Sequence, residues 1–569
     1  MAPLAVLMAN CSKSARWRSR AVEPVMKPMV WIANNRQKIK PLLLLFLIAL
    51  LVRFAAAVIF QFDGLYGQDP FAYYNYSLEL REAFRHLQPP PPFFWPIGYP
   101  LLVVLGTLVA GVRPFAGQLV SIVAGAFIAP LVFLIVCEVK PGAKAGGLVA
   151  GLLAAVSGQL MLSSTAVMSD AAGLAWLTLS AWAMLRYTRV LRPGWLILSS
   201  LTLGLAILTR WSMALAALSW ALSAYLAWRA ASWTWRRMAA AAAVAALAGG
   251  LVVVAQFLPG LGRAELTHVG DLQVVGWNLV NAFRSTVANS DGIFHYERPV
   301  GVYYALPVVH PAFIFPLMTP FLLLGLWSLR ARSRPLAALL LGWPLTVYIF
   351  LAGIAWENPR FSLAMFPPLV ILVGLGLQQA WDWSRVWVSG DQRPIIEVVS
   401  PGTSGPEDSE KDMRWIAKNN AILGRPFDLL SHYWRPFLAG WCALALAGSL
   451  AWSMRDLRNF TAVNRDQISA AQWVAAQVPL GARVITFGLT QTMDHRTELD
   501  VEEIYLQDEI SLSELLASQM PTYLLLDLDN IESQWIGKSP QLNYQWLQEN
   551  TTMREIGRYP PYTLYHIEE

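Results

Sequence analysis

The sequence has little charge and few cysteines for its length. Only 14% of its 569 residues are charged, while 56% are hydrophobic. An average soluble domain carries about 25% charged residues. The three cysteines, Cys11, Cys137 and Cys442, lie in the N-terminal tail or in apolar segments, and no CxxC pair is present. These features exclude a disulfide framework and a zinc site of the usual spacing, and the composition indicates a membrane protein.

The sequence also lacks the motifs of common soluble enzymes. It has no P-loop and no GxGxxG, HExxH or GxSxG pattern. Without a nucleotide site, chemistry at the outer face would need an activated donor that is already in the membrane. A polyprenyl-phosphate sugar meets that need. The net charge is +6, but the basic residues form short clusters between apolar runs, which is an orientation signal and not a nucleic-acid patch.

Long apolar segments predict a polytopic α-helical membrane protein with about eleven transmembrane helices. The first, Leu42–Phe60, can span a hydrocarbon core of about 30 Å, although Arg53 interrupts it and should face a cavity or snorkel outward. The other expected spans are Phe115–Val136, Ala145–Ser163, Ala171–Leu185, Trp195–Leu208, Ser212–Trp228, Ala239–Leu258, Pro307–Leu329, Leu336–Ala355, Phe361–Gln379 and Pro436–Met454.

Basic clusters set the orientation of these spans. Ile97–Val112 is apolar but short, so its crossing is open from length alone. If it does not cross, the clusters near Lys140, Arg186, Arg236 and Arg330 all fall on the cytoplasmic side, as the positive-inside rule requires. We therefore expect a cytoplasmic N-terminus, an extracytoplasmic C-terminus and a multi-pass protein, with a bacterial inner (plasma) membrane as the expected location.

Composition shifts divide the chain into five parts. Residues 1–41 form a basic cytoplasmic tail, and 42–379 form a membrane module with outer loops at 61–114 and 259–306. Residues 380–434 are polar and predict a flexible cytoplasmic loop, followed by the last span at 435–454. Residues 455–569 predict a small extracytoplasmic α/β domain, with strands at Arg483–Phe487, Tyr523–Leu526 and Tyr562–Ile567.

The stretch from Phe62 to Tyr76 holds the first candidate catalytic residue. Asp69 follows the first span and precedes Pro70 and a predicted interfacial helix that includes Tyr73. A carboxylate at the outer face could act as a general base. Asp69 before Pro70 also has the pattern of a helix N-cap followed by its first helical residue, and both interpretations remain open. Asp63 lies closer to the end of the span and ranks below Asp69.

Three further charged residues lie at outward turns. Asp170, in Val167-Met-Ser-Asp-Ala-Ala, is a second candidate catalytic carboxylate or a cap at the start of a span. Arg210 and Arg360 each follow an apolar run, and arginine binds phosphate through a planar fork of donors. Alternatively both arginines snorkel to lipid headgroups. The remaining candidate substrate-binding residues are Tyr73, Glu357, which could simply pair with Arg360, and His310, which could serve only structural hydrogen bonds.

The order of these segments resembles the GT-C superfamily of integral-membrane glycosyltransferases, including the protein O-mannosyltransferase and aminoarabinose-transferase branches. The segments that carry the resemblance are Gly67-Gln-Asp-Pro-Phe-Ala-Tyr-Tyr, Trp95-Pro-Ile-Gly-Tyr-Pro-Leu-Leu, Ser169-Asp170, Leu208-Thr-Arg-Trp and Asn358-Pro-Arg-Phe followed by Pro367. The resemblance implies a lipid-phosphate sugar donor, an inverting single displacement and Asp69 as the catalytic residue. The family often has an acidic residue beside this aspartate, where the present chain has Gln68 and Pro70.

These observations predict a glycosyltransferase that moves a hexosyl or pentosyl group from a polyprenyl-phosphate donor to an extracytoplasmic acceptor, which could be a protein, lipid or glycan. Its expected partners are the donor, the acceptor and membrane lipids, with no nucleic acid. No cofactor is required by this chemistry, and the question of a divalent metal stays open, because the sequence gives no support for a metal site. A transporter or flippase of lipid-linked sugars is the alternative, although such proteins place ionisable groups nearer the middle of the membrane. A non-catalytic scaffold is a third class.

Overall fold

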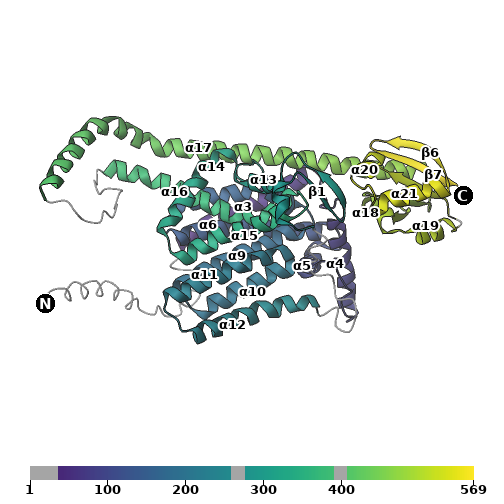
Figure 1. The fold of residues 1–569 in the computed structure, drawn as a ribbon, viewed down its shortest axis with the longest axis horizontal. Helices are drawn as coiled ribbons and strands as arrows, with labels where there is room; N and C mark the ends of the chain where they lie inside the picture. Colours follow the sequence, from purple (N-terminus) through teal and green to yellow (C-terminus); the bar gives the residue numbers. More distant parts are fainter. Residues whose placement is uncertain (1–35, 258–275, 390–405, 519, 569) are drawn as a thin grey trace. The chain divides into compact units, whose positions relative to one another are not determined.

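A computed structural model describes residues 36–257, 276–389, 406–518 and 520–568. The chain divides into two units, 1–44 and 45–569. In the first unit the described residues are the beginning of helix α3 (Arg36–Ile59), and the second unit holds all the other described elements (Figure 1). The rest of the predicted basic tail, 1–35, lies outside the described residues, as does the segment 258–275 of the predicted outer loop 259–306.

The membrane part is a bundle of helices with a few short 3-10 turns. Its first half contains α4 (Asp69–Arg85), α5 (Gly98–Ala110), α6 (Phe115–Val139), α7 (Lys144–Val156), α8 (Gly158–Thr165), α9 (Ser169–Val190) and α10 (Pro193–Thr209). Its second half contains α11 (Ala217–Ala230), α12 (Trp235–Val254), α13 (Val300–Ala305), α14 (Thr319–Ser328), α15 (Arg334–Gly353), η8 (Pro359–Met365) and α16 (Phe366–Ser389). A hairpin of β1 (Thr286–Asn289) and β2 (Gly292–His295) precedes α13.

Several of these helices are long and apolar enough to cross a membrane, so the chain is an integral membrane protein, as predicted. Among the described residues six helices meet this criterion, or seven if the bent pair α7 and α8 forms one span. The six are Ile39–Ile59, Phe115–Val139, Trp235–Phe257, Arg334–Gly353, Pro359–Trp383 and Tyr433–Gln477. Eleven crossings therefore remain a prediction. The short segment 97–112 forms α5, a helix of only 13 residues.

The bend between α7 and α8 explains the arginine inside the first span. These two helices meet at an angle of 51°. Arg53 is fully buried beside the break, and its guanidinium donates hydrogen bonds to the carbonyl oxygens of Ala154 and Ala155 at 3.2 and 2.9 Å. These carbonyls are in the last turn of α7, where no intrahelical donor remains for them. The prediction that Arg53 faces a cavity or snorkels was wrong, because its guanidinium is buried and donates hydrogen bonds to free carbonyl oxygens at the end of α7.

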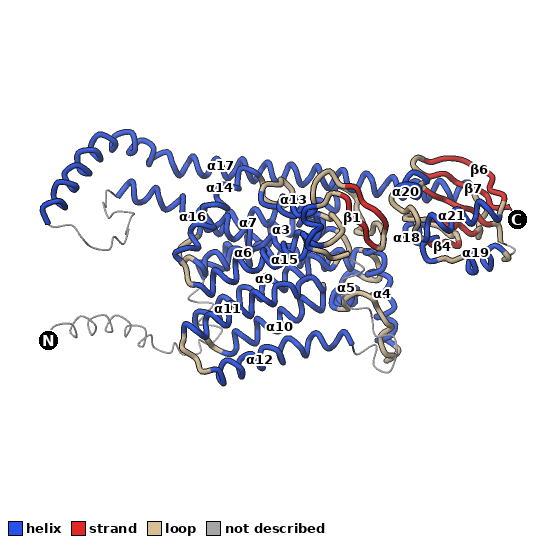
Figure 2. Tube along the Cα trace, viewed as in Figure 1, coloured by secondary structure: helices blue, strands red, loops and turns tan. Residues whose placement is uncertain are grey.

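The last 90 or so residues form a five-stranded mixed sheet with helices on both faces (Figure 2). The strands are β3 (Arg483–Thr486), β4 (Asp500–Glu503), β5 (Thr522–Leu526), β6 (Thr552–Tyr559) and β7 (Tyr562–Glu568), in the order β4-β3-β5-β7-β6. β3 is parallel to β4 and β5, and β7 is antiparallel to β5 and β6. Helices α18 (Thr490–Arg496), α19 (Glu509–Leu516), α20 (Leu528–Ser533) and α21 (Ser539–Asn550) connect them.

Alternating side chains give this sheet two cores. Val484 and Leu525 belong to one buried cluster, whereas Ile485 and Leu524 belong to the other. This is the two-residue period of a strand that is covered on both faces. β3, β5 and β7 correspond to the strands predicted from the sequence. The outward location of this part of the chain stays a prediction.

One helix leads from the membrane bundle directly into the sheet. α17 runs from Pro406 to Gln477, packs against α7, α8 and α16, and contacts α18 at its far end (Figure 1). The described parts of the predicted flexible loop 380–434 are helical, because α16 extends to Ser389 and α17 begins at Pro406; residues 390–405 lie outside the described residues. Only residues 478–482 separate the end of α17 from the start of β3.

Candidate active site

A loop after the first span positions Asp69. Gly64 has a φ of +92°, a conformation that a side chain would strain, and its carbonyl oxygen accepts a hydrogen bond from Val167 N–H at 2.9 Å. The Gln118 amide donates to the carbonyl oxygens of Phe62 and Thr165 at 2.7 and 2.9 Å. These bonds hold the loop against the segment that precedes α9. The loop therefore delivers Asp69 to a defined position at the start of α4.

The carboxylate of Asp69 does not cap α4. Gln68 is the capping residue, it makes no side-chain cap hydrogen bond, and Asp69 is the first residue of the helix. The Asp69 carboxylate instead accepts a hydrogen bond from Arg360 Nη2 at 2.7 Å. The N-cap interpretation from the sequence was therefore wrong. The carboxylate is 33% exposed, which leaves it accessible to a ligand.

Asp170 and the two arginines complete a cluster of four charges. Asp170 is only 2% exposed and lies near the start of α9, 3.3 Å from Arg210 Nη1 and 4.0 Å from Arg360 Nε. Arg210 ends α10 in an extended conformation, so its side chain leaves the helix axis. Arg360 is held by Asn358, whose side chain accepts a hydrogen bond from the Arg360 N–H at 3.0 Å. Asp69, Arg360, Asp170 and Arg210 thus form a continuous chain of alternating charge.

An aromatic ring lies between the two arginines. The Phe361 centroid is 5.7 Å from the Arg210 guanidinium carbon and 5.6 Å from that of Arg360. Cation–π attraction is worth about 0.5–1 kcal/mol or more when it is desolvated. The ring therefore helps to keep two like charges in one site, where their mutual repulsion would otherwise separate them.

Tyr73 lies next to this cluster in an aromatic layer. Its hydroxyl is 3.1 Å from Ser169 Oγ, which is in turn 3.5 Å from Arg210 Nη1. Its ring packs on Trp95 and Tyr99, with centroids 5.1 and 5.3 Å away. Burial raises the pKa of Tyr73 to about 12, so the hydroxyl stays protonated and available as a donor. Trp95 and Tyr99 thus support the Tyr73 ring beside the cluster.

Two atoms of the cluster have no hydrogen-bond partner. Asp170 Oδ2 and Arg360 Nε are both buried, and they face each other across 4.0 Å. A buried donor or acceptor without a partner costs about 1–3 kcal/mol. The site thus retains unused donor and acceptor capacity, which a bound phosphate or hydroxyl could satisfy.

Tyr66 also lies close to these charges. Burial raises the pKa of Tyr66, and the charge of Arg360 opposes this rise only in part.

Glu357 and His310 are separate from the four charges. In the part of the chain that the structure describes, neither forms a hydrogen bond or ion pair with Asp69, Asp170, Arg210 or Arg360. The Glu357 N–H donates to the Tyr296 hydroxyl at 3.1 Å, and His310 Nδ1 accepts from the Ala312 N–H at 3.2 Å. The predicted alternative that Arg360 pairs with Glu357 was wrong. Asp63 is also separate, since it pairs with Arg496 of α18.

Glu357 gives the site region a pH-dependent component. Burial raises its pKa to about 7 from an ordinary value of 4.5, and the charge of Arg298 opposes this only in part. Glu357 loses its proton at a lower pH in the unfolded chain than in the folded protein. The free energy of unfolding therefore falls as the pH rises from about 4.5 to about 7. We expect the melting temperature to decrease less over this range in Glu357→Gln. The exposed neighbour substitution Glu297→Gln is the control, and equal slopes for all three proteins would contradict the assignment.

Sequence reasoning did not single out three residues that contribute here: Tyr66, Ser169 and Phe361. Each lies within three positions of a residue that was selected: Tyr66 is close to Asp69, Ser169 precedes Asp170, and Phe361 follows Arg360. Closeness in sequence to a selected residue is therefore the signal that could have found them. A metal-ligand set is a different matter. Among the residues that the structure describes, no group of three or more His, Cys, Asp or Glu side chains is arranged to hold a metal ion.

The helical bundle is that of an integral membrane protein, and the charged cluster lies at the ends of its helices. A family model described as dolichyl-phosphate-mannose-protein mannosyltransferase matches residues 95–259. The matched region contains Asp170 and Arg210, whereas Asp69 and Arg360 lie on either side of it. The predicted resemblance to the GT-C superfamily is confirmed, and the family model supports the predicted class of enzyme, a glycosyltransferase.

Two solved structures share this fold. ArnT from Cupriavidus metallidurans, bound to undecaprenyl phosphate, is 15% identical, and the alignment covers 92% of this chain and 97% of that one with a TM-score of 0.58. The oligosaccharyltransferase AglB from Archaeoglobus fulgidus, in complex with an inhibitory peptide and a dolichol-phosphate, is 13% identical, with 88% and 70% coverage and a TM-score of 0.53. No curated protein sequence matches the chain significantly.

Proposed function

We propose that this protein transfers one sugar from a polyprenyl-phosphate donor to an extracytoplasmic acceptor. The single observation that carries the proposal is the cluster of Asp69, Asp170, Arg210 and Arg360, assembled from four separate elements. Two guanidinium groups provide the charge and the planar donors that a phosphate needs. Similar proteins are known with such lipids, since the ArnT structure contains undecaprenyl phosphate and the AglB structure dolichol-phosphate.

The two carboxylates have different roles in this proposal because their exposure differs. Asp69 is the accessible one, so it accepts the proton of the acceptor hydroxyl as that oxygen attacks the anomeric carbon. The bond between the anomeric carbon and the phosphate oxygen breaks, and the phosphate leaves with its electron pair toward Arg210 and Arg360. A single displacement of this kind inverts the anomeric configuration. Asp170, which is almost fully buried, assists by orienting the two arginines.

The position of the cluster along α9 supports an outward-facing reaction. Asp170 lies in the first turn of this helix, whereas Arg186 and Arg189 lie near its other end and pair with Glu138 at 3.1 and 2.7 Å. A helix rises 1.5 Å per residue, so these charges are separated by about the thickness of a hydrocarbon core. With the basic end in the cytoplasm, the cluster faces outward. The same proposal includes eleven membrane crossings, a location in a bacterial inner membrane, and a sheet domain on the extracytoplasmic side.

An apolar groove offers space for the donor's isoprenoid chain. It has a volume of about 620 Å³, lies among α5, α6 and α9, and is lined by apolar side chains that include Leu105, Phe127 and Trp176. Its Ala172 belongs to the same buried cluster as Tyr73 and lies two residues after Asp170. A lipid in this groove would therefore have its phosphate end close to the arginines.

Filling the groove should affect long donors more than short ones. Ala175→Trp places an indole among the groove side chains and displaces part of an isoprenoid chain. Loss of two buried methylene contacts corresponds to about tenfold weaker binding. We expect KM for an undecaprenyl-phosphate sugar to rise by about that factor, with little change for a geranyl-phosphate sugar. Leu218→Trp, at an exposed position of α11, is the control. An equal effect on both donors would contradict this role of the groove.

A transfer assay tests the function itself. Purified full-length protein in proteoliposomes would be incubated with radiolabelled undecaprenyl-phosphate mannose and an envelope fraction as the source of acceptor, with and without EDTA. Release of undecaprenyl phosphate together with label in an acceptor supports the transferase. Movement of intact donor across the bilayer without cleavage would support the alternative, a transporter or flippase. Loss of transfer with EDTA would add a divalent metal to a reaction proposed here to need no cofactor.

A further inference from the structure

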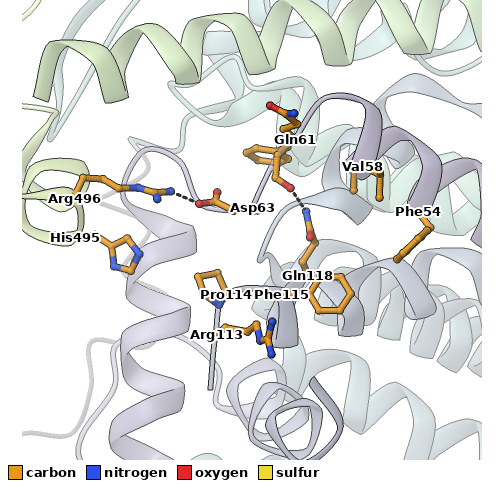
Figure 3. A pocket seen from close by; sticks show the side chains of 12 residues that line it. Phe54, Val58, Gln61, Asp63, Arg113, Pro114, Phe115, Gln118, His495 and Arg496 are labelled. Atoms are coloured by element: carbon orange, nitrogen blue, oxygen red, sulfur yellow. Dashed lines mark hydrogen bonds and ion pairs between the residues drawn. The ribbon is translucent and has the colours of Figure 1, made fainter. Parts of the chain in front are cut away.

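A second cavity lies beside the loop that precedes Asp69. Its volume is about 470 Å³, and its wall includes Phe54 and Val58 of α3, Asp63 of the loop, Arg113 before α6, and His495 and Arg496 of α18 (Figure 3). The hydrogen bond from Gln118 to the Phe62 carbonyl oxygen closes the loop side of this cavity. The cavity thus has walls from the membrane bundle and from the C-terminal part of the chain.

The charges around this cavity favour an anion. Its lining contains two arginines but a single carboxylate, that of Asp63. This carboxylate is already paired with Arg496, as the dashed line in Figure 3 shows. Arg113 is exposed, and helix α6 starts two residues later at Phe115 without a side-chain cap, which adds the positive end of a helix dipole. An anionic group would therefore find net positive surroundings here.

The other half of the cavity is continuous with the membrane-facing surface of α3. Phe54 and Val58 line the cavity and are 45% and 60% exposed. Leu51, one turn before, is 63% exposed. Exposed apolar side chains on a membrane-spanning helix face acyl chains. A ligand that combines an acyl chain with an anionic head matches both halves of the cavity, whereas a free anion matches only one.

The cavity also lies where the C-terminal part contacts the membrane bundle. The His495 ring packs against Phe71 and Tyr74 of α4, with centroids 5.5 and 6.3 Å away. At a separate contact, the Ile293 N–H of the hairpin donates to the Gln534 carbonyl oxygen at 3.0 Å, and Lys538 Nζ donates to the Asn289 carbonyl oxygen at 3.2 Å. A ligand in the cavity would touch both Arg496 and α3. It would therefore strengthen the contact between α18 and α4 that His495 makes.

We propose that this cavity binds the phosphate headgroup of an anionic membrane lipid, and that the lipid holds α18 against the loop after α3. The acyl chain lies along Phe54 and Val58, and the phosphate is bound by Arg113 together with the Arg496 side chain. This site is distinct from the cluster of Asp69 and Arg360, because none of the four charged residues of that cluster lines the cavity. The inference therefore does not rest on the proposed transfer reaction.

Lipid binding can be measured on the full-length protein without any donor or acceptor. Native mass spectrometry of the detergent-solubilised protein, titrated with phosphatidylglycerol or phosphatidylcholine, would report the affinity for each lipid. One Arg near a lipid headgroup is worth about 1 kcal/mol, so Arg113→Gln should weaken phosphatidylglycerol binding about fivefold. Arg284→Gln removes the same charge from an exposed position elsewhere and should leave binding unchanged. Val58→Trp fills the mouth of the cavity and should also weaken binding.

A second measurement separates the lipid from a free anion. Hydrogen exchange of α18 should slow when phosphatidylglycerol is added to the wild-type protein but not to Arg113→Gln. Inorganic phosphate should give no such protection in phosphatidylcholine nanodiscs. Equal protection by inorganic phosphate would overturn the lipid assignment. Undiminished phosphatidylglycerol binding by both Arg113→Gln and Val58→Trp would overturn the site.

Discussion

Replacement of Asp69 by asparagine is expected to abolish sugar transfer while leaving the protein folded. A positioned general base contributes about 10²–10⁴-fold to a rate, and Asp69 is the accessible carboxylate of the cluster. The amide oxygen of asparagine can still accept the hydrogen bond from Arg360 Nη2, so the geometry at α4 should persist. The measurement is the rate of radiolabel transfer at a matched protein level, together with the melting temperature in detergent.

The matched control for this experiment is Asp63→Asn. Asp63 lies in the same loop, but its carboxylate pairs with Arg496 and has no contact with Arg360 among the described residues. Transfer by Asp63→Asn should therefore remain within about tenfold of wild type, a change of about 1.4 kcal/mol in the barrier. Near-normal transfer by Asp69→Asn would remove Asp69 from the reaction.

Replacement of Arg360 by glutamine is expected to reduce both stability and donor binding. Arg360 is the residue that links the two carboxylates, at 2.7 Å from Asp69 and 4.0 Å from Asp170, and its side chain is only 16% exposed. Without it, only Arg210 remains to balance two acids. Breaking a buried ion pair costs about 3–5 kcal/mol, and the partial exposure of Asp69 places this site at about the lower end. Thermal unfolding and competition by undecaprenyl phosphate would measure the two effects.

Two further variants separate charge from geometry at this position. Arg360→Lys keeps the positive charge but loses the planar fork and the contact with the Phe361 ring, so it should recover stability more than donor binding. In the double variant Asp69→Asn/Arg360→Gln one uncompensated carboxylate is gone, and its stability should exceed that of Arg360→Gln alone. A double variant that is less stable than Arg360→Gln would show that the two side chains do not interact as described.

Much of the helical architecture could be predicted because apolar runs and turn residues are local signals. The helix after Asp69, the short helix at 98–110 and three strands of the C-terminal sheet all correspond to patterns in the sequence. β4 and β6 were not predicted: Asp500–Glu503 is acidic, and Thr552–Tyr559 contains four charged or glycine residues and no buried position. Neither has the alternation by which a half-buried strand is recognised.

The members of the candidate site could be selected from the sequence, but their contacts could not. Asp69 and Asp170 were selected as outward-facing carboxylates that could act as a base, and Arg210 and Arg360 as isolated cations at outer turns. Which acid pairs with which arginine depends on how the bundle folds, and the Asp69–Arg360 pair joins positions 291 residues apart. Glu357 was the alternative partner of Arg360 because it is close in sequence, yet the Arg360 guanidinium contacts Asp69 and Met168 instead.

The two helix caps expected at Asp69 and Asp170 show why local rules fail here. Both residues stand at helix starts, where a carboxylate normally accepts backbone N–H groups. Neither forms a side-chain cap in the structure, because a guanidinium lies within reach of each. A charged donor is a stronger partner for a carboxylate than a neutral amide. The sequence indicates the helix start correctly, and only the folded chain reveals the competing partner.

The ribosome makes both acids of the cluster before either arginine. Asp69 and Asp170 enter the membrane first, Arg210 follows, and Arg360 arrives only when most of the bundle has been synthesised. A nascent or truncated chain that ends before Arg360 therefore displays an uncompensated carboxylate at Asp69. The Asp69–Arg360 pair can therefore form only after most of the bundle has been synthesised.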